Sequence, residues 1–346
     1  MKNRLTLLLL VFLYNLTFGQ NCNCIENFDF LKEKVEKDYA GFADKVNDNT
    51  INDYRKHSEK FREKATKTTT TQRCVLIMEE WLKFFNDKHL QLSITSNIYW
   101  TFKSIDSTSI LFRIPSFSYN SKPLIDSLIR TNYELIRKTP ILIIDLRGNG
   151  GGIDYSFLEL LPFIYTHPYE SKGVGYWASK GNIEYFEKAL EEGNIRKGRE
   201  EETKELIAAL KSNENTFVNT RKNDLVKRDS IFEFPKKVGI IVNDFCASSC
   251  EQFVLACKNS EKSTVFGTNT LGVLDYSNSV PSKLPISNVE LYYPMTRSNR
   301  LPDFPIDNIG IEPDVRINLH DNLNIKDDVD EWVIFVKEYL ENELIK

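Results

Sequence analysis

The stretch ILIIDLRGNGGG, from Ile141 to Gly152, constrains the fold more than any other part of this chain. Its apolar first part indicates a buried strand. Three consecutive glycines, Gly150 to Gly152, follow that strand. Glycines in such a place let the backbone approach a ligand closely, and their N–H groups can point at an anion or a developing oxyanion. The pattern therefore predicts a ligand-binding loop at the end of a buried strand, with a tight surface turn as the simpler alternative.

Strand-like and helix-like segments alternate on both sides of this loop. Strands are expected at 90–94, 109–114, 238–242, 264–266 and 288–293, and helices at 122–138, 155–164, 246–258 and 328–344. This alternation is typical of a mostly parallel sheet covered by helices, so the predicted fold class is α/β. Residues 27–85 are expected to be helical, because apolar residues recur at helical spacing between Cys74 and Phe85.

These patterns divide the chain into successive parts. The expected organisation is a signal peptide at 1–19, an N-terminal helical cap at 20–88, a core at 89–325 and a C-terminal helix at 326–346. Residues 180–213 are rich in charge and are expected to form a helical insertion or lid on the core, with its charges as a solvated face.

The N-terminus has the pattern of an export signal. Lys2 and Arg4 precede an apolar stretch from Leu5 to Leu16, which is too short to span a bilayer as a mature helix. Cleavage is expected after Gly19, and a retained membrane anchor is the less favoured alternative. The mature protein is therefore expected to be periplasmic, displayed on the cell surface or secreted, without an integral membrane span.

Charge and cysteine content narrow the partners and cofactors. The chain has a formal net charge of −4 and shows no stripe of basic residues, so nucleic acid is not an expected partner. An exported protein meets oxidising conditions, and we expect a disulfide from the Cys22/Cys24 pair to Cys74. Cys246 and Cys250 are close enough to pair if the backbone permits it. The four histidines do not join the cysteines at the spacing of zinc ligands, so no such zinc site is expected.

A serine pair lies between the strand expected at 238–242 and the helix that follows it. Ser248 and Ser249 occur in the phrase NDFCASSCEQF, where a serine commonly only caps the helix. In an α/β sheet, however, the loops at the carboxyl ends of neighbouring strands meet. A serine on one loop and an oxyanion cradle on the other form the geometry of acyl transfer.

A serine nucleophile also needs a base, and His89 is the best candidate. It lies in the polar phrase NDKHLQL, after the expected helices. His57 lies in a charged helix, and His167 and His320 lie in loops without a supporting motif. A lone histidine is more often structural, so this assignment depends on its context.

Four phrases, ILIIDLRGNGGG, ASSCE, VFGTNTLGV and IGIEPDV, together resemble the tail-specific, or C-terminal-processing, serine peptidase family. The resemblance covers roughly residues 75–320 in the right order. The family includes the tricorn core peptidase and the retinoid-binding protein of photoreceptors. It implies a crotonase-like (ClpP/crotonase) core. The segment between His89 and Gly150 consists of expected core elements, so no PDZ domain is expected.

The resemblance also assigns roles to residues. It implies Ser248 as the nucleophile, and an oxyanion hole made by Ser249 with Gly150, Gly151 and Gly152. Glu251, Asp145 and Arg147 are implied as structural support for this site.

The implied base separates two branches of the family. The processing peptidases use a lysine in a phrase like TFGKG, but this chain reads TLGVL and has Val273 at that position. The resemblance therefore points to the branch with the tricorn core and the retinoid-binding protein. The base of the tricorn-like enzymes is a histidine, and the resemblance places it at His89 in this chain. Asp307 is the nearest match to the orienting carboxylate. Asp87, or a loop near Asp275 and Tyr276, is an alternative partner for the imidazole.

The predicted function is that of an exported serine peptidase. Ser248 would form an acyl-enzyme on a peptide or protein substrate, with His89 as general base and no metal or organic cofactor. Two alternatives remain open. One is a catalytically inactive binding protein for peptides or apolar ligands on the same scaffold, and the other is an esterase-type acyl hydrolase.

Overall fold

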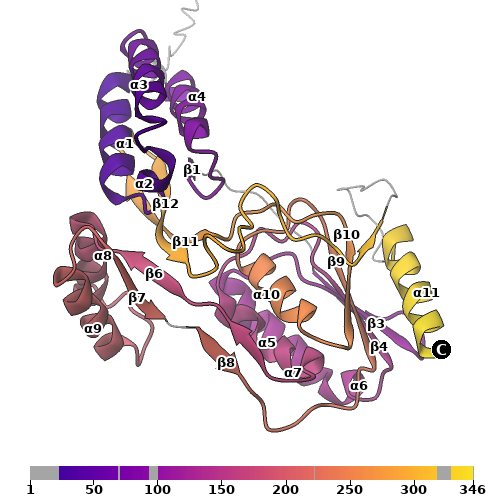
Figure 1. Cartoon of the computed structure of the whole chain (residues 1–346). Coiled ribbons are helices and arrows are strands. Elements are labelled where there is room, and N and C mark those ends of the chain that lie inside the picture. The colour runs from indigo at the N-terminus through magenta and orange to yellow at the C-terminus, as the bar shows by residue number, and fades with distance from the viewer. Residues whose placement is uncertain (1–22, 69–70, 93–99, 222, 318–328, 346) are drawn as a thin grey trace, which may run out of the picture.

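The computed structural model describes residues 23–68, 71–92, 100–221, 223–317 and 329–345, and it has a mixed α/β fold (Figure 1). The N-terminal helices lie at one end of the molecule, and a six-stranded sheet with its covering helices forms the other. The signal peptide expected at 1–19 lies outside the described residues. Within the described part of the chain, no helix is both long and apolar enough to cross a membrane.

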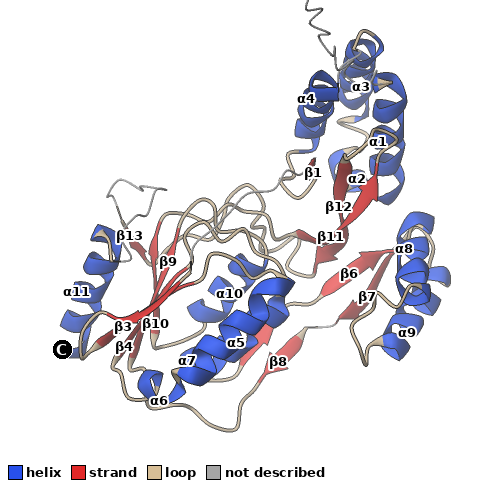
Figure 2. Cartoon of the chain, turned by 180° about the vertical axis from the view of Figure 1, so that it is seen from behind, coloured by secondary structure: helices blue, strands red, loops and turns tan. Residues whose placement is uncertain are grey.

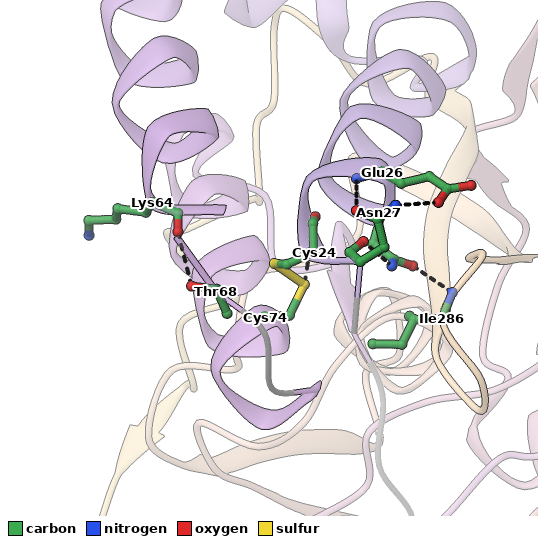
Figure 3. The surroundings of a disulfide bond; sticks show 8 residues. Cys24, Glu26, Asn27, Lys64, Thr68, Cys74 and Ile286 are labelled. Atoms are coloured by element: carbon green, nitrogen blue, oxygen red, sulfur yellow. Dashed lines mark hydrogen bonds between the residues drawn. A yellow bond between two sulfur atoms is a disulfide. The ribbon is translucent and has the colours of Figure 1, made fainter. Parts of the chain in front are cut away.

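The N-terminal helices are joined by a disulfide bond. They are α1 (Cys24–Asp38), α2 (Phe42–Lys45), α3 (Ile51–Thr66) and α4 (Thr71–Leu82), followed by the short 3-10 helix η1 (Lys83–Phe85). Cys24 at the start of α1 bonds to Cys74 in α4 (Figure 3). The predicted bridge to Cys74 is thus confirmed, with Cys24 as its partner. Cys246 and Cys250 are free and buried, so a bond between them is not formed.

The six-stranded sheet carries the expected parallel core. Its order is β13 (Val315–Arg316), β10 (Ser263–Gly267), β9 (Lys237–Val242), β4 (Ile141–Asp145), β3 (Ser109–Arg113) and β2 (Thr101–Ser104). All neighbours in this order are parallel except β2 and β3. The carboxyl ends of β3, β4, β9 and β10 therefore meet at one edge of the sheet, where the glycine loop follows β4 and the Ser248 turn follows β9.

Helices cover both faces of this sheet because successive side chains in a strand point to opposite faces. Leu142 and Ile144 pack on one face with α5 (Lys122–Thr131), α6 (Tyr133–Ile136), α7 (Leu161–Ile164) and α10 (Ser249–Lys258). Ile141 and Ile143 pack on the other face with α11 (Glu331–Ile345). The C-terminal helix thus packs on the core, as expected.

Two helices differ from the prediction. The helix expected at 122–138 is divided at Asn132, whose backbone leaves the helical region and whose side chain bonds to the Leu128 carbonyl at 2.8 Å. Such side-chain bonds compete with the helical ladder. The helix expected at 155–164 begins as the 3-10 helix η3 (Asp154–Leu160), and only its last turn, α7, is α-helical.

A second, antiparallel sheet lies beside the N-terminal helices. It contains β1 (Gln91–Leu92), β12 (Glu290–Ser298), β6 (Val174–Trp177), β7 (Phe217–Arg221) and β11 (Tyr276–Lys283). β5 (Tyr169–Ser171) and β8 (Asp224–Val226) form a separate pair. The strand expected at 288–293 is the first part of β12, and the one expected at 90–94 is described only as β1. β11 was not expected, because YSNSVPSK is polar and contains a proline.

This sheet shares one hydrophobic core with the N-terminal helices. Leu291 and Tyr293 of β12 pack in the same cluster as Phe28 and Trp81. Residues 180–213 are helical, as expected, and form α8 (Lys180–Glu191) and α9 (Glu200–Lys211), beside β6 and β7 (Figure 2). Its buried residue Leu210 also belongs to this cluster. The helical segment therefore does not bury its apolar surface alone.

Candidate active site

Ser248 lies in a sharp turn between β9 and α10. Its backbone has φ 56° and ψ −120°, a region that side chains rarely adopt. Such a conformation costs about 1–3 kcal/mol and persists only where the surroundings enforce it. The helix expected from Cys246 begins later, at Ser249, because this turn intervenes. Ser248 is half-buried and lines a cleft of about 2010 Å³. The turn thus presents the serine to the cleft, as in a nucleophile elbow.

Glu251 enforces this turn from inside the protein. Its carboxylate accepts hydrogen bonds from the N–H groups of Ser248 (2.9 Å), Gly272 (2.8 Å) and Val273 (3.0 Å), and from the Thr270 hydroxyl (2.6 Å). Burial raises the pKa of Glu251, and the hydrogen bonds to the carboxylate oppose that rise. The carboxylate therefore ties the Ser248 turn to the loop after β10.

The glycine loop packs directly against this turn. A Cβ on Gly151 would lie 2.5 Å from the Ala247 carbonyl oxygen and 2.9 Å from the Ser248 Cβ, so only glycine fits. The Gly151 N–H donates to Asn149 Oδ1 at 2.9 Å. The N–H groups of Gly150 and Ser249 make no hydrogen bond to any residue that the structure describes. Both residues line the cleft, as does Gly152. Gly150 and Ser249 therefore offer free donors beside Ser248.

Asp145 and Arg147 anchor the start of the glycine loop. Both are buried, and Arg147 Nη2 donates to Asp145 Oδ2 and to Asp330 Oδ2, each at 2.8 Å. Arg113 Nε donates to Asp145 Oδ2 at 2.8 Å. Burial alone would raise the pKa of Asp145, but Arg147 and Arg113 lower it. These residues hold the loop to the end of β4 and to the start of α11.

His89 lies in the same cleft as Ser248, on the loop after η1. Neither ring nitrogen makes a hydrogen bond to a described residue, so no bond joins His89 to Ser248 in this structure. A nitrogen of the ring and one oxygen each of Asp87 and Asp307 lie within 4.8 Å of one another. Burial lowers the pKa of His89, and the charges of Asp87 and Asp275 oppose this. Burial therefore favours the neutral imidazole, which is the form that a general base needs.

Two carboxylates flank the imidazole, and each is fixed by its own partner. Asp307 Oδ1 accepts from the N–H groups of Leu274 and Asp275 at 2.6 and 2.7 Å. Asp87 Oδ2 accepts from the Tyr39 hydroxyl at 2.5 Å. Burial, and then the charge of Asp87, raise the pKa of Asp307 to about 7.

The side chains of Asp275 and Tyr276 bond to segments other than the His89 loop. Asp275 Oδ2 accepts from the N–H groups of Ile306 and Asp307, so it positions the Asp307 loop. The Tyr276 hydroxyl donates to Asp44. Sequence reasoning missed Tyr39 and the buried Arg300, which lies 3.6 Å from Asp275 Oδ1. Neither residue belongs to a recognisable sequence motif, because only the folding of the chain brings it near the site.

The model of peptidase family S41 matches residues 110–317, more than half of the chain. The chain belongs to peptidase family S41. This confirms the family that the four sequence phrases resemble. A comparison with curated proteins gives no significant match.

Solved structures share the fold of this S41 member over nearly its whole length. Mature CPAF is 12% identical, with a TM-score of 0.63 over 92% of this chain and 95% of that one. A lipoprotein from Streptococcus agalactiae is 17% identical, with a TM-score of 0.54 over 93% and 97%. Tricorn protease is 12% identical, with a TM-score of 0.54 over 94% of this chain and 37% of that one. At these identities, the likeness shows the fold alone.

This S41 member has a buried valine, Val273, at the position where the sequence resemblance places the lysine of the processing branch. Val273 lines the cleft, and its N–H donates to Glu251, which also holds Ser248. Lys88 lies beside His89 in the chain, but its Nζ donates to the Leu271 carbonyl at 2.8 Å. Position 273 therefore supplies no ammonium group to the serine.

Proposed function

We propose that this S41 member is an exported serine peptidase in which Ser248 is the nucleophile and His89 the general base. The observation that carries this proposal is the conformation of the Ser248 turn. The backbone of Ser248 is held at a positive φ against the glycine loop, and Ser248 lines the cleft that His89 also lines. The six-stranded sheet would be the crotonase-like core, and the N-terminal helices its cap.

The proposed reaction follows the general scheme of serine peptidases. His89 takes the proton of Ser248 as the hydroxyl attacks the peptide carbonyl, and it then gives that proton to the leaving amine. The N–H groups of Ser249 and Gly150 stabilise the oxyanion of the tetrahedral intermediate. His89 then activates a water molecule, which hydrolyses the acyl-enzyme. Asp307 would hold the imidazole and stabilise its charged form.

Substrate must bring the catalytic groups closer than they lie here. Catalytic hydrogen bonds are often long without substrate and tighten in the complex. Residues of the N-terminal segment and of the glycine loop both line the cleft, so a peptide that fills it would contact both. Binding of the peptide would therefore close the distance between His89 and Ser248.

Hydrolysis of a set of fluorogenic peptides by the purified full chain tests this mechanism. Ser248→Ala should abolish turnover, and His89→Ala should lower kcat by at least about 10⁴-fold. Val273→Ala is the matched control within the same cleft and should keep nearly normal activity. Full activity in Ser248→Ala would overturn the mechanism. Turnover of esters alone would favour an acyl hydrolase, and retention of an apolar ligand without any turnover would favour a binding protein.

Export is part of the proposal and is supported by two features. The N-terminal pattern is that of a signal peptide. The Cys24–Cys74 disulfide is the kind of bond that persists in oxidising compartments. We propose a periplasmic, cell-surface or secreted location, which fractionation of cells that produce the full chain would test. Recovery of the protein in the cytoplasm with Cys24 and Cys74 reduced would contradict it.

A further inference from the structure

Three potential metal ligands converge beside the proposed base. Asp87 and His89 come from the loop after η1, and Asp307 comes from the segment before β13. Each offers one ligand atom, and these atoms lie within 4.8 Å of one another. One imidazole nitrogen and two carboxylate oxygens form a ligand set that a single ion can bind.

Several polar atoms in this cluster are buried without a partner. Both ring nitrogens of His89 and Oδ2 of Asp307 are shielded from solvent and make no hydrogen bond to any described residue. Most buried polar side-chain atoms in proteins have a partner, so each exception calls for a water, an ion or a functional explanation. A single partner, such as a bound cation, can satisfy one ring nitrogen together with Asp307 Oδ2, whereas the other ring nitrogen points away from it.

The carboxylates are also held as metal ligands usually are. The Tyr39 hydroxyl bonds to Asp87 Oδ2, and two backbone N–H groups bond to Asp307 Oδ1. Outer hydrogen bonds of this kind orient ligands and tune their affinity. In Asp307 they use one oxygen and leave Oδ2 for another partner.

In the described part of the chain, the charge of Arg300 acts on Asp307, but no basic side chain pairs directly with this cluster. Among the described residues, no lysine or arginine forms an ion pair with Asp87 or Asp307. The nearest basic groups have other partners, since Arg300 lies against Asp275 and Lys88 bonds to Leu271. A bound cation would supply the missing positive charge.

We propose that Asp87, His89 and Asp307 bind a zinc ion, and that the bound ion reversibly inhibits the peptidase. An imidazole ligand favours zinc or a similar transition metal over magnesium or calcium, which prefer oxygen ligands. The metal occupies the lone pair of a His89 nitrogen, so the imidazole no longer takes the proton of Ser248. The inhibitory role rests on the proposed function, whereas the binding site does not. The ion is a regulator and not a cofactor of hydrolysis.

Zinc binding to the untagged full chain carrying Ser248→Ala tests the site without any need for activity. Titration calorimetry with zinc chloride should show one ion per chain. Removing an outer partner of a metal site costs about 10–100-fold in affinity, so removing a ligand by His89→Ala or Asp307→Asn should cost at least about 100-fold. Tyr39→Phe should weaken binding by about tenfold. His167→Ala is the matched control, because this exposed histidine also lies near an acid, Glu261, at 4.0 Å.

The outcomes separate this proposal from the proposed function. Stoichiometric binding that requires His89 and Asp307 supports the site, even if the wild-type chain hydrolyses no peptide. In an active wild-type chain, zinc should inhibit hydrolysis, EDTA should restore it and magnesium should have no effect. Absence of zinc binding overturns the proposal while leaving Ser248-dependent hydrolysis intact. Binding that survives His89→Ala also overturns it and would assign the metal to the buried thiols of Cys246, Cys250 and Cys257.

Discussion

At the scale of single residues, Ser248 depends on a carboxylate behind it. Glu251 has no exposed surface and uses both oxygens to hold N–H and O–H donors of two segments, the Ser248 turn and the loop at 270–273. It is a positioning residue, since it lies behind the turn. The phrase ASSCE implies its role as structural support, but only the fold shows the four groups that donate hydrogen bonds to it.

Glu251→Gln tests this clamp. The NH₂ group of glutamine is a donor and would face N–H or O–H groups that now donate to the carboxylate. Those buried groups would lose their acceptor, at a cost of about 1–3 kcal/mol in stability. We expect lower stability in denaturant unfolding and a lower kcat with a smaller change in KM. Glu261→Gln, at an exposed position, is the control and should change neither quantity. An unchanged kcat in Glu251→Gln would show that the turn holds without this clamp.

Asp307 makes stability depend on pH. Its pKa is raised from 3.8 to about 7 in the folded chain. The folded state therefore holds a proton that the unfolded state releases, and this group's contribution to stability falls as pH rises through that interval. Asp307→Asn removes the charge and keeps Oδ1 as an acceptor, so its Tm should exceed that of the wild type by about 2–4 °C at pH 8.

Thermal unfolding in EDTA at several pH values measures this difference. The gap in Tm between Asp307→Asn and the wild type should shrink toward zero near pH 4, where both side chains are neutral. A gap that stays constant with pH would show that Asp307 is ionised throughout. Peptide hydrolysis by the variant should fall at pH 8, where the wild-type carboxylate is charged, because the amide supplies no negative charge to His89.

At the scale of elements, the glycine loop and the Ser248 turn are one packed unit. Gly151 has φ 91° and contacts Ala247 and Ser248 too closely to carry a side chain. Gly150 has open space where its Cβ would point. Two neighbouring glycines thus differ in their tolerance of alanine, although the sequence presents them alike.

Gly151→Ala and Gly150→Ala form a matched pair. The first variant must move the Ser248 turn, so we expect at least a 100-fold loss of kcat/KM, equivalent to about 2.7 kcal/mol, and reduced stability. The second should fold normally and lose less activity. Kinetics and unfolding of both variants measure this. Equal effects on stability would contradict the packing described here.

At the scale of the whole molecule, the candidate site joins two assemblies. Ser248 belongs to the parallel sheet, whereas His89 follows the N-terminal helices, which share a core with the antiparallel sheet. The Asn27 side chain also accepts a hydrogen bond from the Ile286 N–H at 2.5 Å (Figure 3). The position of His89 therefore depends on the packing of the helical segment.

Removing the disulfide tests this dependence. Cys24 and Cys74 are 50 residues apart in sequence, and the loss of a native disulfide typically costs about 2–5 kcal/mol. A double Cys24→Ser and Cys74→Ser variant should unfold at lower denaturant concentration and lose activity before the parallel sheet unfolds. A reductant should destabilise the wild type but not this variant. An equal effect of reductant on both would assign it to the free cysteines instead.

The sequence alone determined the parallel sheet, the glycine loop and the family, because these depend on local patterns. Apolar runs mark the buried strands, consecutive glycines mark the loop, and the serine follows the next strand. The tertiary structure decided the rest. The antiparallel sheet is polar in β11, and its strands come from distant segments. The surroundings of His89 depend on Tyr39, Asp87, Asp275 and Asp307, which lie far apart in the chain. Only long-range packing brings such residues together, and no local pattern records it.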